Sequence, residues 1–225
     1  MKLNLSKPIL YLITPGATVE NATPSSQPYQ DILRQVRAAA AAGIDLIQIR
    51  EKRLSAGALF ELTSRVMQIV RGSATRVLVN DRADIAAGAE ADGVHLTTQS
   101  LDAGVVRKTF GADFLIGVST HSDLEARQAR DAGADFVVFG PVFSTPSKAR
   151  YGPALGLNSL SMVTRELTRF PVLAIGGVSR ENVSSVAETG ASGIAAITLF
   201  SDPVSFQSNI DMLRSWFEDK EERSR

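Results

Sequence analysis

The segments PVLAIGG at residues 171–177 and GIAAIT at residues 193–198 decide the fold. Both contain short, continuous apolar runs, which are typical of strands buried on both faces of a parallel sheet. The first segment ends in two glycines, where the missing Cβ lets backbone N–H groups approach a ligand closely. Ser179 then predicts the N-cap of a helix that begins near Arg180. A glycine pair beside a helix N-terminus predicts an anion-binding site.

A short junction between helix and strand recurs along the chain. It combines a glycine, a small or acidic residue and an apolar strand, as in Gly43-Ile44-Asp45 and Gly133-Ala134-Asp135. Glycine supplies the left-handed helix cap, and the short polar residue turns the chain into the strand. Similar junctions occur at residues 90–93, 110–113 and 189–192. This repetition predicts regularly alternating helices and strands.

Eight strands and eight helices follow from this alternation. The strands are expected at residues 9–14, 45–50, 76–80, 93–96, 113–118, 135–139, 171–175 and 193–197. The helices are expected at residues 29–42, 55–72, 82–89, 101–110, 122–132, 157–168, 180–189 and 203–218. Strict alternation implies right-handed parallel crossovers, and eight pairs imply closure into a TIM (β/α)8 barrel. An open doubly wound sheet is the alternative.

The bulk composition predicts one domain and excludes several classes of function. No linker or shift in composition divides residues 1–225, although the charged tail at 219–225 is expected to fray. Lys plus Arg and Asp plus Glu both number 24, so no net charge attracts nucleic acid or a membrane surface. The absence of cysteine excludes disulfides, thiolate metal sites and a cysteine nucleophile. The apolar patch at residues 8–13 is too short for a membrane span and lacks a cleavage region, which predicts a cytoplasmic protein.

Polar residues at the expected strand ends predict the site, because the chemistry of a barrel lies where its strands end. In the second strand, alternation places Gln48, Arg50 and Lys52 on one side and Ile47 and Ile49 on the other. Arginine binds phosphate bidentately and lysine adds a point charge, so the first side suits a polyanionic ligand. A solvated run of surface charges is the alternative, but Gln48 lies within the apolar run itself.

The third strand ends in Asn80-Asp81-Arg82. The Asn-Asp pair either caps the following helix or contributes to a cation site. A carboxylate that faces cations and a phosphate is an arrangement that Mg²⁺ uses in proteins. The site therefore has a predicted metal ligand beside its predicted cations.

Two histidines and two serines lie on or just after the next two strands. His95, on the fourth strand, is expected to be a packed and hydrogen-bonded histidine, and two histidines argue against a multi-histidine zinc site. After the fifth strand, either Ser119 or Ser122 is expected to cap the next helix. The other hydroxyl, or His121, then faces the pocket.

The loop after the sixth strand is long and rich in hydroxyl groups. Thr145, Ser147 and Lys148 together suit a second anion, and a loop of this length suits an active-site lid. A flexible, solvated loop is the alternative.

The order and spacing of these segments resemble those of thiamine phosphate synthases over most of the chain. The resemblance is carried by Gln48–Lys52, Asn80–Arg82, Gly93–Leu96, Gly117–Ser119, Gly140–Lys148 and Ala174–Gly177. It implies a TIM barrel that joins a hydroxymethylpyrimidine pyrophosphate to a thiazole phosphate, giving thiamine phosphate and pyrophosphate. Mg²⁺ and cations would stabilise the departing pyrophosphate, so the reaction needs no protein nucleophile.

The resemblance also implies the site residues. The pyrimidine pyrophosphate would be bound by Gln48, Arg50, Lys52, Asn80, Ser119 and Lys148. The thiazole phosphate would be bound by Thr145, Ser147, the Gly177 backbone, Ile197 and Thr198. The further substrate-binding residues would be Ile49, Glu51 and Pro146. The catalytic residues would be Arg50, Lys52, Ser119 and Lys148. Asp81 and Ser100 would bind Mg²⁺.

One turn departs from the family pattern. After Gly93–Leu96 the family has a Gly-Gln-Glu-Asp-type turn, whose aspartate is the second Mg²⁺ ligand. This sequence has TTQS at residues 97–100, so Ser100 occupies that position. A serine coordinates Mg²⁺ weakly or through water, and one carboxylate with pyrophosphate can suffice. Asp102 is the candidate substitute.

The same departure supports two alternative functions. The thiazole tautomerase of this superfamily shares the barrel, dispenses with Mg²⁺ and uses a histidine as acid and base, for which His121 is in position. The synthase is favoured by the retained pyrophosphate set, which comprises Asn80, Asp81, Arg50, Lys52 and Lys148. A non-catalytic thiamine-pathway binder is the third hypothesis. The expected partners are small-molecule substrates and, from the resemblance, a second copy in a homodimer, with neither nucleic acid nor membrane.

Overall fold

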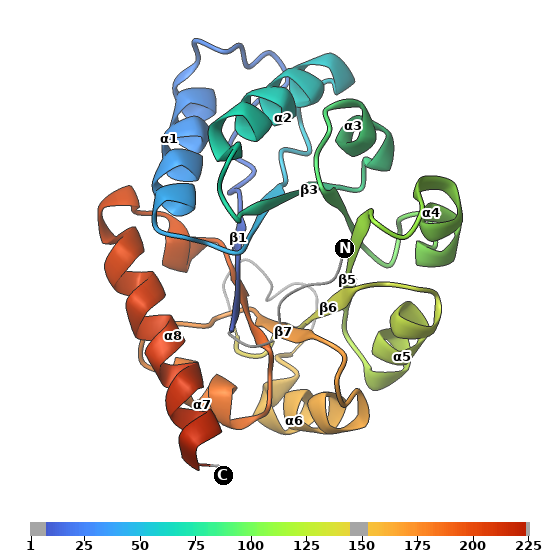
Figure 1. The fold of residues 1–225 in the computed structure, drawn as a ribbon, viewed down its shortest axis with the longest axis vertical. Helices are drawn as coiled ribbons and strands as arrows, with labels where there is room; N and C mark the ends of the chain where they lie inside the picture. Colours follow the sequence, from blue (N-terminus) through green and yellow to red (C-terminus); the bar gives the residue numbers. More distant parts are fainter. Residues whose placement is uncertain (1–7, 145–152, 224–225) are drawn as a thin grey trace.

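Eight parallel strands close into a barrel in chain order, and the helices form a ring around it (Figure 1). The computed structural model describes residues 8–144 and 153–223, with side chains described to Phe217. The predicted site residues Thr145, Pro146, Ser147 and Lys148 lie outside the described residues. The first strand pairs with the last, which excludes the open doubly wound sheet and confirms the predicted TIM barrel.

Helices follow strands in regular succession. The strands are β1 (Ile9–Ile13), β2 (Leu46–Ile49), β3 (Arg76–Asn80), β4 (Gly93–Leu96), β5 (Leu115–Thr120), β6 (Phe136–Phe139), β7 (Val172–Ile175) and β8 (Gly193–Ala196). The helices are α1 (Gln27–Ala41), α2 (Ala56–Val70), α3 (Ala83–Gly88), α4 (Ala103–Phe110), α5 (Asp123–Asp131), α6 (Gly156–Glu166), α7 (Val183–Glu188) and α8 (Phe206–Arg223), with the short 3-10 helices η2 (Thr198–Phe200) and η3 (Pro203–Ser205) before α8. Within the described residues, no helix combines the length and apolar character that a membrane span requires.

Alternation along the strands divides the apolar residues between two cores. One side of each strand faces the helices, and on β2 this side carries Ile47 and Ile49. The other side faces the barrel interior, which Leu46 and Phe136 help to fill. Gln48 follows Leu46 on the inward side and is 1% exposed, as the alternation of the second strand predicts.

The recurring junctions have the backbone that their sequence predicts. Gly43, Gly133 and Gly190 have φ angles of 77°, 93° and 89°, in the left-handed region that glycine enters without steric cost. The junction before β4 has no glycine at this position, and Glu90 adopts the same conformation with φ of 56°. Helix ends and strand starts are therefore set locally.

The polar residue that precedes each even-numbered strand has a further role. Its side chain accepts a hydrogen bond from a backbone N–H of the strand before it, and we call these four contacts the strand-start hydrogen bonds. They join Asp45 to Leu10 (3.0 Å), Asp92 to Val77 (2.8 Å), Asp135 to Ile116 (2.7 Å) and Ser192 to Val172 (3.4 Å). They connect the strands in pairs at the end of the barrel where the strands begin.

Most element boundaries differ from the sequence-based prediction by one or more residues, and two of the differences concern residues that the sequence analysis singled out. β5 begins at Leu115 and extends to Thr120, so Ser119 lies inside the strand. α7 begins at Val183, and the predicted N-cap at Ser179 is wrong. The Asn182 side chain accepts a hydrogen bond from the Ser179 N–H (2.8 Å) and donates one to the Gly177 carbonyl (2.9 Å). These two bonds stabilise a turn before the helix, so α7 begins at Val183 and not near Arg180. Fraying of the tail stays a prediction.

Candidate active site

The predicted polar residues of β2 to β5 converge on the inward side of the barrel near the carboxyl ends of the strands. Gln48 is paired with Leu78 on β3, and Asn80 is paired with His95 on β4. His95 is paired in turn with Gly117 on β5. Because these pairs are adjacent around the barrel, their inward side chains surround one space at the rim.

Arg50 supplies an uncompensated positive charge to this rim. Its backbone N–H donates a hydrogen bond to Thr14 Oγ1 (2.8 Å), which joins the end of β2 to the end of β1. The guanidinium lies near Gly16, where a Cβ atom would be 3.5 Å from Nη1. Among the described residues, no ion pair or hydrogen bond engages this guanidinium. The charge is therefore available to an anionic ligand.

Gln48 supplies an unpaired donor in the barrel interior. Its Nε2 atom is buried and has no hydrogen-bond partner among the described residues, and the Tyr11 hydroxyl shares both properties. Leaving a buried polar group unpaired costs about 1–3 kcal/mol. Such a donor beneath a cationic rim is suited to contact a polar ligand.

Asp81 is held at the end of β3 in a left-handed conformation, with φ of 59°. This conformation is uncommon for non-glycine residues, although aspartate adopts it more readily than most, and such residues occur often at functional sites. The Asp81 N–H donates to the His95 carbonyl (2.9 Å), and its carboxylate accepts from Asn80 Nδ2 (2.9 Å). Neither side chain caps α3, which begins at Ala83 without a side-chain cap, so the alternative of a helix cap is wrong.

Ser100 contacts Asp81 through its hydroxyl group, which donates to Asp81 Oδ1. Ser100 Oγ also accepts a hydrogen bond from the Thr97 N–H (2.6 Å) and lies 3.0 Å from Thr97 Oγ1. Asp102, the candidate substitute ligand, instead caps α4 by accepting from the Gly104 N–H (2.8 Å). Within the described part of the chain, no group of three His, Cys, Asp or Glu residues is placed to bind a metal ion.

His95 is the packed, hydrogen-bonded histidine that the sequence predicts. It is 2% exposed, and its Nε2 lies 2.9 Å from Ser119 Oγ. Burial and, secondarily, the positive charge of Arg50 lower the pKa of His95 from 6.5 to about 3. The imidazole is therefore neutral at physiological pH.

The polar residues at the end of β5 have different roles: one faces the barrel interior and another caps the next helix. Ser122 caps α5 by accepting from the Glu125 N–H (3.1 Å), which leaves Ser119 as the hydroxyl that faces the interior. His121 is exposed, and its Nδ1 lies 3.3 Å from Glu125 Oε2. The expectation that one of the two serines caps the helix is confirmed, and the role of Ser119 in the pocket stays a prediction.

Glu51 has a structural role that the sequence did not reveal. Its side chain is 2% exposed, and its carboxylate accepts from the backbone N–H groups of Gly16 and Thr18 (both 3.0 Å) and from Thr18 Oγ1 (2.6 Å). These bonds fix the loop after β1, whereas Lys52 beside it is exposed. The partners are distant in sequence, so no local pattern could indicate them.

The ends of β7 and β8 form the glycine-rich part of the rim. Gly177 has φ of 66°, and a Cβ atom there would lie 2.7 Å from Phe143 Cβ, so glycine is required for both conformation and space. Ile197 packs against the interior core, and Thr198, the first residue of η2, is exposed. Thr198 is thus an exposed hydroxyl-bearing residue at the end of β8, the strand that pairs with β7.

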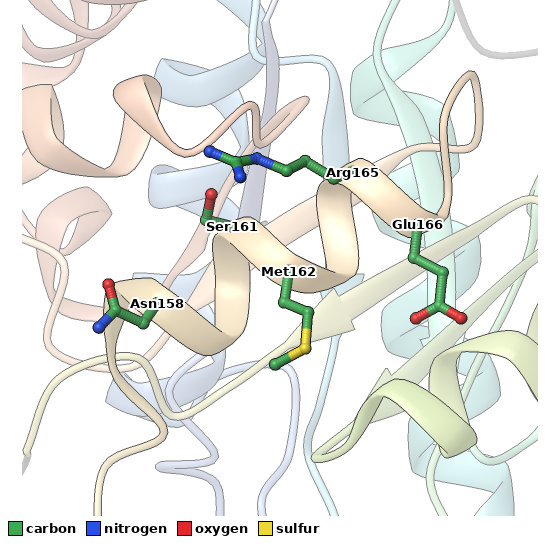
Figure 2. A pocket seen from close by; sticks show the side chains of 5 residues that line it. All are labelled: Asn158, Ser161, Met162, Arg165 and Glu166. Carbon is green, nitrogen blue, oxygen red and sulfur yellow. The ribbon is translucent and has the colours of Figure 1, made fainter.

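One hollow of the surface borders this rim, and another lies away from it. A cavity of about 360 Å³ beside Ser100 and Ser119 extends between the barrel and helices α4 and α5. A second, shallow hollow on α6 is lined by Asn158, Ser161, Met162, Arg165 and Glu166 (Figure 2). These five residues belong to one exposed helix face and include none of the predicted site residues, so this hollow is not the candidate active site.

Comparisons with known proteins identify the family and support the fold. The family model described as "Thiamine monophosphate synthase" matches residues 10–200. The thiamine-phosphate synthase of Syntrophomonas wolfei is 34% identical over 209 residues, covering 93% of this chain and 96% of its own. That of Anaeromyxobacter dehalogenans is 45% identical over 167 residues, covering 74% of each chain. The solved thiamine phosphate pyrophosphorylase from Pyrococcus furiosus superposes with a TM-score of 0.78 at 29% identity, covering 96% of this chain and 98% of its own.

The closed barrel and the polar rim define a (β/α)8-barrel enzyme. The chain belongs to the thiamine monophosphate synthase family. The predictions of this family, of a transferase and of synthase function are confirmed by the comparisons. The individual roles of the site residues stay predictions.

Proposed function

We propose that this protein condenses a hydroxymethylpyrimidine pyrophosphate with a thiazole phosphate, giving thiamine phosphate and pyrophosphate. The observation that carries the proposal is that one positive and one negative side chain lie at the same rim and that neither is neutralised by an ion pair. Among the described residues, neither the Arg50 guanidinium nor the Asp81 carboxylate has an ion-pair partner. A metal-bound pyrophosphate group would satisfy both charges.

The reaction requires stabilisation of a leaving group. The bond between the pyrimidine methylene carbon and the pyrophosphate oxygen breaks, and its electron pair leaves with pyrophosphate. The thiazole nitrogen then donates its lone pair to the methylene carbon. Arg50, Lys52 and the Ser119 hydroxyl would bind the oxygens on which negative charge develops, and Lys148 is proposed for the same role.

The pyrimidine ring would lie over the buried polar residues of the interior. Gln48 Nε2 lacks a protein partner and is available to a ring nitrogen or an exocyclic group. Asn80 directs its amide to Asp81 and would hold that carboxylate toward the ligand. Ile49 packs against the helices, so its proposed contact with substrate is through the backbone.

The thiazole phosphate would bind on the opposite part of the rim. The Gly177 backbone and the exposed Thr198 hydroxyl are suited to a phosphate group, beside Ile197 as an apolar contact. Thr145, Pro146 and Ser147 are proposed to complete this subsite. Glu51 would contribute indirectly, because it fixes the loop next to Arg50.

The residues present fit a Mg²⁺ ion that is held by one carboxylate and by substrate oxygens. Asp81 is positioned by hydrogen bonds from the neutral groups of Asn80 and Ser100, which leave its negative charge uncompensated. When bound, Mg²⁺ would neutralise charge on the departing pyrophosphate. Ser100 Oγ already donates a hydrogen bond to Asp81 and contacts the N–H and hydroxyl groups of Thr97. We therefore propose that Ser100 orients the Asp81 carboxylate more than it ligates the metal.

A coupling assay with both substrates tests the proposal. Thiamine phosphate should form with Mg²⁺ and not after its removal by a chelator. Aromatisation of a thiazole carboxylate phosphate that is lost in His121→Ala, without any coupling, would instead support the tautomerase. Binding of both phosphates without turnover would support the non-catalytic binder. A homodimer and a cytoplasmic location stay predictions.

A further inference from the structure

His95 and Ser119 form a hydrogen-bonded pair on the inward side of two adjacent strands. His95 Nε2 and Ser119 Oγ are 2.9 Å apart. Because His95 is paired with Gly117, Ser119 lies one inward position closer to the carboxyl end of the barrel. The histidine therefore lies beneath the serine, on the side away from the rim.

Packing fixes the orientation of the His95 ring. The ring centroids of Tyr11 and Phe136 lie 5.7 Å and 6.2 Å from that of His95. Gly117 leaves space for the ring, since a Cβ atom there would lie 2.8 Å from His95 Nδ1. This packing holds the ring with Nε2 directed at Ser119.

The two ring nitrogens differ in their surroundings. Nδ1 is buried and has no hydrogen-bond partner within the described ranges. A proton on Nδ1 would be a buried donor without an acceptor, which folded proteins rarely contain, whereas an unpaired acceptor is better tolerated. Protonation of both nitrogens would place a buried cation near Arg50. A neutral ring with its proton on Nε2 satisfies these constraints.

We propose that His95 is a positioning residue whose Nε2–H donates to Ser119 Oγ and thereby directs the serine hydroxyl proton toward the rim. A hydroxyl has one proton and two lone pairs, so an oxygen that accepts from His95 must point its own proton elsewhere. The inference rests on the proposed function, in which that proton is donated to a pyrophosphate oxygen. A donor oriented before the reaction needs no reorganisation as the leaving group gains charge.

The first test determines the tautomer in the unaltered protein. Long-range ¹H–¹⁵N correlation spectra of protein labelled at histidine distinguish the protonated ring nitrogen from the unprotonated one, and His95→Gln assigns the signals. We expect the His95 proton on Nε2 and none on Nδ1. A proton on Nδ1 would overturn the proposal. The tautomer is read from the unaltered protein, and His95→Gln serves only to show which signals belong to His95.

The second test compares variants that keep or remove the donor. His95→Gln retains an uncharged N–H group, whereas His95→Phe retains a ring without a donor. His95→Phe should weaken the binding of inorganic pyrophosphate, measured by calorimetry, and lower kcat by about tenfold each, while His95→Gln stays within about threefold. Equal losses in the two variants would overturn the proposal.

A double-mutant cycle separates positioning from a purely structural role. Ser119→Ala should cost little more in the His95→Phe background, because His95 acts through Ser119. Additive losses would mean that the two residues act independently and would contradict the inference. The tautomer and pyrophosphate binding need no turnover, so absence of coupling activity would refute the proposed function and leave the test of the pair intact.

Discussion

Ser100 donates a hydrogen bond to Asp81 across the ends of β4 and β3. A neutral hydroxyl thus occupies the place where a second carboxylate would double the negative charge offered to a cation. A single carboxylate binds Mg²⁺ weakly unless phosphate oxygens complete the shell. The metal should therefore bind together with pyrophosphate.

Replacement of Ser100 tests this dependence. Ser100→Asp should raise the affinity of the substrate-free protein for Mn²⁺ by about tenfold or more, because a second carboxylate joins the site. Electron paramagnetic resonance titration with Mn²⁺ measures the change. Gln99→Asp, on an exposed neighbour in the same turn, adds the same charge as a control and should have little effect. An equal gain in both variants would mean that general electrostatics, and not Asp81, sets the affinity.

Arg50 should be essential for the leaving group. Arg50→Ala should reduce kcat by about 100-fold or more, because an oriented charge contributes several kcal/mol to transition-state stabilisation. Arg50→Lys should recover part of the rate, since lysine keeps the charge but loses the bidentate fork. Arg53→Ala, which removes an exposed arginine three residues further on, is the matched control. Similar steady-state rates for Arg50→Ala and Arg53→Ala would contradict the assignment.

Glu51 should matter chiefly for stability. Glu51→Ala leaves the half-buried N–H group of Gly16 and the buried N–H group of Thr18 without an acceptor, so the free energy of unfolding should fall by about 2–4 kcal/mol. Urea denaturation followed by circular dichroism measures this loss. Glu61→Ala removes a carboxylate from an exposed ion pair with Arg65 and should cost less than about 0.5 kcal/mol. An unchanged midpoint for Glu51→Ala would show that the loop is held by other contacts.

His95 should make stability depend on pH. Its folded pKa of about 3 is below the unfolded value of 6.5, so the unfolded chain binds more protons between these values. The contribution is complete above pH 6.5 and is lost as the pH falls toward 3. Between pH 7.5 and pH 5 the loss should be about 2 kcal/mol. Urea denaturation at both pH values measures it, and His95→Gln should show a correspondingly smaller difference. The same difference in both proteins would assign the effect to other groups.

The positions of the strand ends follow from short-range patterns. Alternation in the second strand separates Gln48 and Arg50 from Ile47 and Ile49 because successive side chains of a strand point to opposite faces. The glycine junctions are equally local, since Gly43 and Gly133 set the helix ends through their own φ angles. These features therefore predict both the barrel and its polar rim.

Contacts between distant segments did not follow from such patterns. The bonds from Thr18 to Glu51 and between His95 and Ser119 join residues whose local sequence gives no sign of a partner. Ser179 was wrongly predicted as a cap because Asn182 competes for the same turn. Sequence shows which polar groups occur near a site, and tertiary structure decides what each of them contacts.

The strand-start hydrogen bonds give the barrel a fourfold construction. Each of them lies within one βαβ unit, from β1–β2 to β7–β8, and none crosses between units. In a circular permutant opened within α2, the two residues of every strand-start hydrogen bond stay close together in the new sequence. In one opened within α1, Leu10 and Asp45 would lie near opposite ends of the new chain. Each βαβ quarter of the barrel therefore contains a hydrogen bond that joins its own two strands.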